Sequence, residues 1–303
     1  MIKRVFYYLL FTIVLLAAFS YFRIADAKTF LSNFFLFRDP LIGGMVAGLV
    51  VAYLGVYMLF NRIVFMSLAV TQGAGLGIFL ALLVGAWLGL EHMNAWISLG
   101  SGIGLALLIS LSFGFYRRQR HLSDESMIGI LYVLASSLIV LVGDRISEGR
   151  HEIDNLLFGN AVAVTTHYLW VLVIGAGLLL LVHLLFYRQF LYCSADPEFM
   201  QTQGVKVGLW RALLYLTLTV GITLAVKLLG SLTIVALIVI PPFIGLRRGK
   251  NAASAFVIAS LLGLVCPAVG FYLSYLFSLP AGASVVSVCG LYLLLSLLED
   301  KFR

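Results

Sequence analysis

The chain has 303 residues, of which 62% are hydrophobic and only 11% are charged. A soluble domain of this length cannot bury so much apolar surface, so we expect one integral membrane domain over residues 1–303 that is surrounded by lipid. The net charge of +7 is typical of a membrane protein with a positive cytoplasmic face, and it gives a nucleic-acid partner little support.

Ten apolar stretches are long enough to cross a bilayer as helices, because about 17 to 25 such residues span its hydrocarbon core. They are apolar on every face, whereas the strands of a membrane barrel alternate. The sequence therefore predicts an all-α polytopic membrane protein with about ten transmembrane helices, at residues 5–22, 41–60, 67–90, 95–116, 126–143, 167–187, 209–226, 231–246, 252–277 and 282–298.

Residues 1–40 are expected to form an extra N-terminal helix and an outside linker. Residues 24–27 (IADA) resemble a small-residue signal-peptidase site, so the first helix is either a retained span or a removed signal. When the first helix is retained, 14 of the 20 Lys and Arg residues fall in segments on the same side of the membrane as the N-terminus. That pattern places both termini in the cytoplasm of a multi-pass protein in the cell (inner or plasma) membrane.

Glycines and prolines mark places where the predicted helices meet or bend. Small residues let membrane helices approach closely, so we expect the glycines of the third and fourth spans to serve packing. Prolines remove a backbone hydrogen bond and are expected to kink or unwind spans eight and nine. These residues are Gly73, Gly75, Gly77, Gly100, Gly102 and Gly104, followed by Pro241, Pro242 and Pro267.

Two polar segments separate the spans. The outside segment 143–166 contains His151 and Glu152, but Asn155 stands where a zinc-protease helix needs its second histidine, so we expect a solvated loop. The inside segment 188–208 contains Asp196, a favourable N-cap, and Gly204, a favourable helix end. It predicts an amphipathic helix of about two turns, which is either an ordinary interfacial helix or a docking element for a cytoplasmic partner.

Catalytic chemistry is missing from the spans. No carboxylate lies at mid-membrane depth, and His183 is about one turn from the predicted cytoplasmic end. There is no phosphate-binding loop with its lysine and no nucleophile motif, so the chain is not expected to be an enzyme or to hold a cofactor, and any use of ATP must come from a partner. The spacing of Cys193, Cys266 and Cys289 predicts neither a disulfide nor a zinc site.

Several short motifs occur in a characteristic order between residues 41 and 298. With these motifs the chain resembles the membrane permease of ATP-binding-cassette (ABC) importers for zinc, manganese or iron, which is similar in fold to the vitamin B12 and siderophore permeases. The motifs are Ser123-Asp124 with Ile128-Gly129-Ile130, Leu156 to Asn160 (LLFGN), Leu191-Tyr192 through Asp196, Glu198 and Gly204, Gly230 through residues 236–241 (ALIVIP), and Ser274-Tyr275 followed by residues 279–283 (LPAGA).

The resemblance implies a homodimer or heterodimer with a second permease, ABC ATPase subunits on the cytoplasmic side and an extracytoplasmic metal-binding protein. It also implies that segment 188–208 is the coupling segment, whose helix inserts into a groove of the ATPase. The residues implied in coupling are Asp196, Glu198, Gln201 and Gly204, and the candidates for docking the binding protein are Arg38, Asp39, Glu148, Arg150 and Glu152.

One departure from the family concerns the third span. Where the family carries an acidic residue and, four positions later, a histidine, this chain has Leu68 and Gln72. The chain is therefore the half of a heterodimer without metal ligands, a permease that passes the ion by neutral oxygen donors, an importer of a different small solute, or a regulatory subunit. The pathway-lining candidates are Ser67, Thr71 and Gln72, although Gln72 can instead make a hydrogen bond between helices.

Overall fold

The structure, a computed structural model, describes residues 2–88, 95–116, 124–146, 149–159 and 166–301. Its helices are α1 (Ile2–Phe22), α2 (Ile24–Ser32), α3 (Phe34–Phe60), α4 (Met66–Trp87), α5 (Ala95–Tyr116), α6 (Asp124–Gly143), α7 (Gly149–Phe158), α8 (Thr166–Leu185), α9 (Tyr187–Ala195), α10 (Pro197–Thr202), α11 (Val207–Leu229), α12 (Ser231–Arg248), α13 (Ala252–Phe277) and α14 (Ala281–Lys301). No strand occurs in these ranges.

Each of the ten predicted spans overlaps one long helix, so the expectation of an all-helical membrane protein is confirmed. Within the described residues, eight helices are long and apolar enough to cross a bilayer, namely α3, α4, α6, α8, α11, α12, α13 and α14. Helices α1 and α2 give a ninth candidate only as a pair that is bent by 107°. The apolar part of α5, Trp96–Ser112, is shorter.

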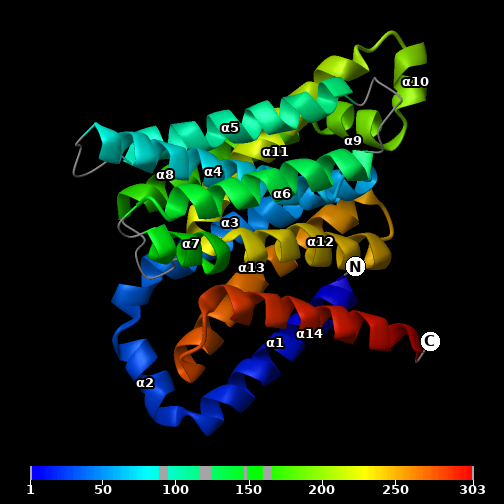
Figure 1. Ribbon diagram of the computed structural model, residues 1–303. Helices are drawn as coiled ribbons and strands as arrows, with labels where there is room; N and C mark the ends of the chain where they lie inside the picture. The colour runs from blue at the N-terminus through cyan, green and yellow to red at the C-terminus, as the bar shows by residue number, and fades with distance from the viewer. Residues whose placement is uncertain (1, 89–94, 117–123, 147–148, 160–165, 302–303) are drawn as a thin grey trace.

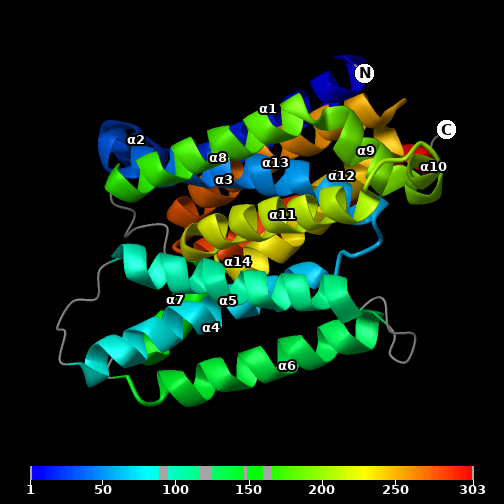
Figure 2. The same ribbon diagram turned by 90° about the horizontal axis from the view of Figure 1, so that it is seen from above.

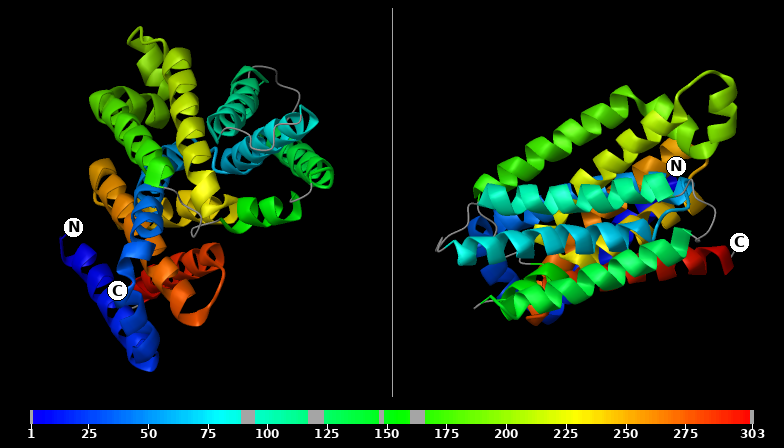
Figure 3. Two further views of the ribbon diagram at one scale, coloured as in Figure 1. Left: turned by 90° about the vertical axis from the view of Figure 1, so that its left-hand side faces the viewer. Right: turned by 45° about the horizontal axis from the view of Figure 1, so that its top comes forward.

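Helix α3 forms the centre of the bundle. It packs against α8, α11, α12 and α13, and its residues 50–58 are all buried. Helices α4, α5 and α6 form a group on one side of this centre, and α1 lies on the other side (Figure 2; Figure 3, left), while α14 packs against α12 and α13. The two chain ends and α10 lie at one end of the bundle, and α2 lies at the opposite end (Figure 1). We call these the α10 end and the α2 end.

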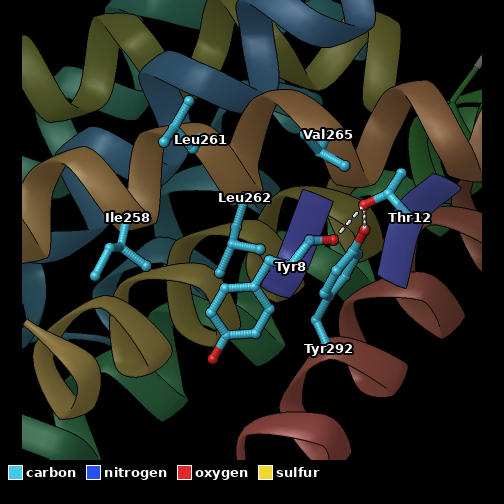
Figure 4. A pocket seen from close by; sticks show the side chains of 7 residues that line it. All are labelled: Tyr8, Thr12, Ile258, Leu261, Leu262, Val265 and Tyr292. Carbon is cyan, nitrogen blue, oxygen red and sulfur yellow. Dashed lines mark hydrogen bonds between the residues drawn. The ribbon is translucent and has the colours of Figure 1, made fainter. Parts of the chain in front are cut away.

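Helix α1 is attached to α13 and α14 by polar side chains. The Thr12 hydroxyl donates a hydrogen bond to the Tyr8 carbonyl at 2.7 Å and is itself bonded to the Tyr292 hydroxyl. Nearer the α2 end, the hydroxyls of Ser20 and Tyr272 are 2.7 Å apart. Figure 4 shows the pocket that α1 leaves against α13, with the Tyr8 and Tyr292 rings on one side and aliphatic side chains such as Leu262 on the other.

The part of residues 1–40 that was expected to be an outside linker is largely helical. Helix α2 extends to Ser32, and α3 begins at Phe34 and contains Pro40. The reason is aromatic packing, because Phe30 stacks on Phe37 with ring centroids 5.1 Å apart. Phe30 also contacts Tyr272 of α13, and such contacts stabilise helices that sequence polarity alone does not predict.

The segment 143–166, which is predicted to lie outside, is not simply a solvated loop, since it contains α7. Ile153 and Leu156 lie on one face of α7 and fill the space beside two glycines. A Cβ atom on Gly143 would lie 2.7 Å from Ile153 Cδ1, and one on Gly75 would lie 2.6 Å from Leu156 Cδ2. The loop therefore folds back onto α4 and α6, and this packing maintains its helical form.

The prolines do not unwind α12 or α13, which corrects that part of the expectation, since both helices are continuous through them. Pro242 leaves the Ile238 carbonyl without its usual helical donor. That carbonyl faces α3, because a Cβ on Gly55 would lie only 2.3 Å from Ile238 O. Pro267 likewise leaves the Gly263 carbonyl without a donor, and a Cβ on Gly48 would lie 2.2 Å from Gly263 O. The two glycines allow α3 to cover the freed carbonyls, with Cα–H groups as weak donors.

The glycines of α4 serve packing as expected, but only part of the α5 series does. A Cβ on Gly77 would lie 2.4 Å from Ser101 O and 2.7 Å from the Cα of Gly102. Gly100 and Gly104 have no heavy atom within 4 Å of an added Cβ in the described part of the chain. Glycine therefore allows close approach of α4 and α5 at Gly77 and Gly102, and at Gly73, where an added Cβ would lie 2.5 Å from Ile109 Cδ1.

Candidate functional site

The polar residues of α4 are buried. Ser67 and Thr71 are fully shielded, and Gln72 is 6% exposed. The Ser67 hydroxyl donates to Val64 O at 2.7 Å, and the Thr71 hydroxyl donates to Leu68 O at 2.9 Å, so both bonds stay within one turn of the chain. Within the described part of the chain, the Gln72 amide makes no side-chain hydrogen bond. This geometry gives no support to the expectation that Gln72 makes a hydrogen bond between helices.

Leu68 and Gln72 lie on one face of α4, since residues four apart are neighbours on a helix surface. The donors available to a cation there are neutral oxygens, the Gln72 side-chain carbonyl and the Thr71 hydroxyl. No group of three or more His, Cys, Asp or Glu side chains that could hold a metal is found among the described residues. The α4 face therefore offers hydrogen bonding and weak oxygen coordination without charge.

The segment 188–208, which is predicted to lie inside, contains most of α9 and all of α10, where one helix was predicted. Helix α9 follows α8 after one residue, and Asp196 separates it from α10. The predicted cap is confirmed, because the Phe199 amide donates to Asp196 Oδ1 at 3.0 Å, with Pro197 in the first turn. Gly204 has a φ of +76°, the left-handed conformation that favours glycine at a helix end.

Helix α10 projects from the bundle. None of its residues is buried, and Glu198, Gln201 and the 57% exposed Phe199 face solvent. Figure 1 shows α10 beyond the ends of α5 and α11, where it has no helix on its outer side. A capped helix that ends in a glycine turn and carries an exposed aromatic ring is suited to insertion into a groove on another protein.

Three motif stretches that are far apart in the sequence meet at the α2 end. A Cβ on Gly230, between α11 and α12, would lie 2.3 Å from the Gly159 amide nitrogen. A Cβ on Gly282, in the first turn of α14, would lie 2.4 Å from Phe158 O. Gly159 and Gly230 both have positive φ, at +81° and +77°. The α7, α11–α12 and α14 segments therefore pack backbone to backbone, which explains why glycine is required in all three motifs.

Arg38 and Asp39 lie in the first turns of α3 and not in a linker. Thr166, at the start of α8, donates to Asp39 Oδ2 at 2.7 Å, and Arg38 Nε donates to the other carboxylate oxygen at 3.1 Å. Asp39 thus ties α3 to α8, while Arg38 remains exposed. Of the other docking candidates, Glu148 lies outside the described residues, as do the side chains of Arg150 and Glu152.

The partners of His183 are not predicted from the sequence. It is fully buried behind α9, between aromatic rings of α3 and α9 and a threonine of α11. The three cysteines, Cys193, Cys266 and Cys289, are free and buried. Cys193 lies on α9, where burial raises the pKa of its thiol above the ordinary value.

Comparisons with known proteins agree with one another. The model of the ABC 3 transport family matches residues 33–300, so α1 and α2 precede the matched region. The manganese import system permease protein ScaB of Streptococcus gordonii is 27% identical over 269 residues, which cover 88% of this chain and 92% of ScaB. An uncharacterized membrane protein of Synechocystis is 28% identical over 86% of this chain and 89% of its own length.

Among solved structures, the fold is similar to that of PsaBC from Streptococcus pneumoniae, solved in complex with a Fab. The TM-score is 0.77, with 23% sequence identity, over 90% of this chain and 95% of the other chain. At this identity the likeness concerns the fold alone.

Proposed function

The chain belongs to the ABC 3 transport family, and from this premise we propose that it is the membrane permease of an ATP-driven importer for a divalent transition metal. The observation that carries the proposal is α10, a capped helix with no buried residue at the end of a membrane bundle. In this reading α10 docks on an ABC ATPase, and the α10 end, with both termini, lies in the cytoplasm.

The partners follow from what the chain lacks and what it exposes. Its sequence has no phosphate-binding loop, so ATP hydrolysis belongs to a partner and the chain itself is not an enzyme. Helices α6 and α8 are mostly uncovered, with 22% and 28% of their apolar windows buried. These faces are available to lipid and to a second permease. An extracytoplasmic binding protein would deliver the substrate at the α2 end, where Arg38 is exposed.

Manganese is the first substrate to test, since a relative in Streptococcus is named a manganese import system permease protein and one in Listeria a manganese transport system membrane protein. Zinc is the second. Manganese accepts oxygen ligands readily, whereas zinc favours imidazole and thiolate. The neutral oxygens of Thr71 and Gln72 on α4 therefore suit brief passage of manganese better than tight binding of zinc.

A second candidate function rests on Leu68 and Gln72. Because the charged pair implied by the family resemblance is replaced by these residues, the chain could be the half of a heterodimer that has no ligands, or a regulatory subunit, while a ligand-bearing permease conducts the metal. An importer of a different small solute would also need no metal ligand at this position. The ligand-free half, the regulatory subunit and the importer of another solute would all retain α10 as the docking element.

The test is co-purification of the full chain with the ATPase and the binding protein encoded beside its gene, followed by ATPase assays in liposomes. Stimulation of hydrolysis by manganese-loaded binding protein, with no second permease present, supports the importer. Stimulation only after a second permease is added supports the ligand-free half. Failure of the ATPase to bind contradicts both.

A further inference from the structure

His183 is a buried ionisable residue that neither the α4 face nor α10 uses. It lies near the C-terminal end of α8, is 0% exposed, and points toward α11 and α9. Ionisable side chains inside a membrane bundle are costly and usually functional. Phenylalanine or leucine could fill this position if packing were its only role, so the nitrogen atoms of the imidazole need a separate explanation.

One polar contact joins the imidazole to a second helix. His183 Nε2 lies 2.9 Å from Thr217 Oγ1 on α11. The Thr217 hydroxyl is also 2.9 Å from Leu214 O, and when it donates its proton there, its oxygen accepts the proton of Nε2. Nδ1 is buried and has no hydrogen-bond partner in the described part of the chain, which favours the neutral ring. The imidazole therefore makes one directed bond from α8 to α11.

The faces of the same ring contact two further helices. Phe190 of α9 stacks on it with centroids 4.5 Å apart and planes inclined by 16°. Tyr57 of α3 lies 5.1 Å away and contacts Phe256 of α13 at 4.7 Å. We call His183, Phe190, Tyr57 and Thr217 the His183 cluster. It joins α8, α9, α3 and α11 at one point, behind the segment that leads directly into α10.

We propose that His183 is a positioning residue that transmits movement of α9 and α10 to α11 and α3. The inference rests on the proposed function, since α10 must receive that movement from an ATPase. Only Asp196 separates α9 from α10, so displacement of α10 displaces the Phe190 ring. Because packed interiors shift between discrete arrangements and do not deform continuously, the stacked imidazole moves with Phe190 and pulls on Thr217.

The test uses the full complex in liposomes. It compares variants that remove or keep the hydrogen bond between His183 and Thr217. His183→Phe keeps an aromatic ring for Phe190 but removes the donor, and Thr217→Val removes the acceptor with little change in shape. Thr217→Ser keeps the hydroxyl. The matched control is Thr219→Val, because the Thr219 hydroxyl bonds only within α11, to Tyr215 O at 2.7 Å. Thermal midpoints and ATPase affinity are measured for each variant.

The expected readout is substrate transported per ATP hydrolysed. It should fall about tenfold in His183→Phe and in Thr217→Val, which is the size of effect that one buried hydrogen bond has on an equilibrium. The double variant should be no worse than either single variant, since both remove the same bond. Thr217→Ser and Thr219→Val should transport as the unaltered protein does, and ATPase affinity should be retained throughout.

Two results would overturn the inference. Unchanged transport per ATP in His183→Phe and Thr217→Val would show that the bond carries no movement. Equal losses in Thr217→Ser and Thr217→Val, or additive losses in the double variant, would show a role in packing alone. If the unaltered chain does not bind the ATPase, the proposed function fails first, and that result is distinct from either outcome.

Discussion

The α9–α10 segment and the polar face of α4 are built on different physical grounds. The segment depends on backbone conformation, because Asp196 caps α10 and Gly204 ends the turn with a φ of +76°. The α4 face depends on side chains alone, since Leu68 and Gln72 occupy an ordinary helix that packs through glycine. Ligand chemistry can therefore be lost at α4 by two substitutions while the backbone stays intact, whereas α10 cannot change as easily.

The largest expected effect comes from restoring charge to α4. Leu68→Asp combined with Gln72→His places a carboxylate and an imidazole on one helix face, where they can bind a transition metal together. We expect a dissociation constant on the order of 1 μM for manganese or zinc, measured by calorimetric titration of the purified chain. Each single variant is the control. If the folded double variant binds no metal, this face does not line the pathway.

The contact between α4 and α5 gives the next largest effect. Gly77→Ala should lower the free energy of unfolding by about 1–3 kcal/mol, because the added methyl group meets Ser101 O in a closely packed contact. Gly104→Ala is the control, since nothing lies within 4 Å of its added methyl group among the described residues. Thermal unfolding in detergent measures both. Equal midpoints for the two variants would mean that α4 and α5 do not meet at Gly77.

The turn after α10 should be sensitive to substitution because of its backbone conformation. Gly204→Val forces a branched side chain into the left-handed region at a cost of about 1–2 kcal/mol. Because that cost distorts the docking element, affinity for the ATPase should fall by roughly 5- to 30-fold. Gly208→Val, at an open position in α11, should have no such effect. Titration of immobilised complexes compares them, and equal affinities would exclude Gly204 from docking.

The smallest effect concerns the cap of α10. Asp196→Ala removes the acceptor of the Phe199 amide and should destabilise this short helix by about 1 kcal/mol, whereas Asp196→Asn should retain most of the cap. Hydrogen exchange of the α10 amides reports the difference without the partner. Exchange that is equally fast in all three proteins would show that the cap does not hold the helix.

A structural feature could be predicted from the sequence when the residues that cause it lie close together in the chain. The spans and the α10 cap were predicted because apolar runs and the pattern of Asp196, Pro197 and Gly204 act within a few residues. Helix α7 was not, since its packing depends on Gly75, distant in the chain. The partner of His183, Thr217, is 34 residues away, and no local pattern indicates that pairing.

The same distinction holds for the prolines of α12 and α13. Sequence alone predicts a kink, because each proline removes a hydrogen bond from its own helix. The glycines that cover the freed carbonyls, Gly48 and Gly55, are both on α3. Their effect is visible only in the packing of α3 against both α12 and α13.

The most direct test of the central claim is ATP-dependent manganese uptake into liposomes that contain this chain, its ATPase and its binding protein. The account predicts uptake that requires ATP and is lost in Gly204→Val while Gly208→Val transports normally. Uptake that persists without the ATPase, or that is the same in both variants, would contradict it.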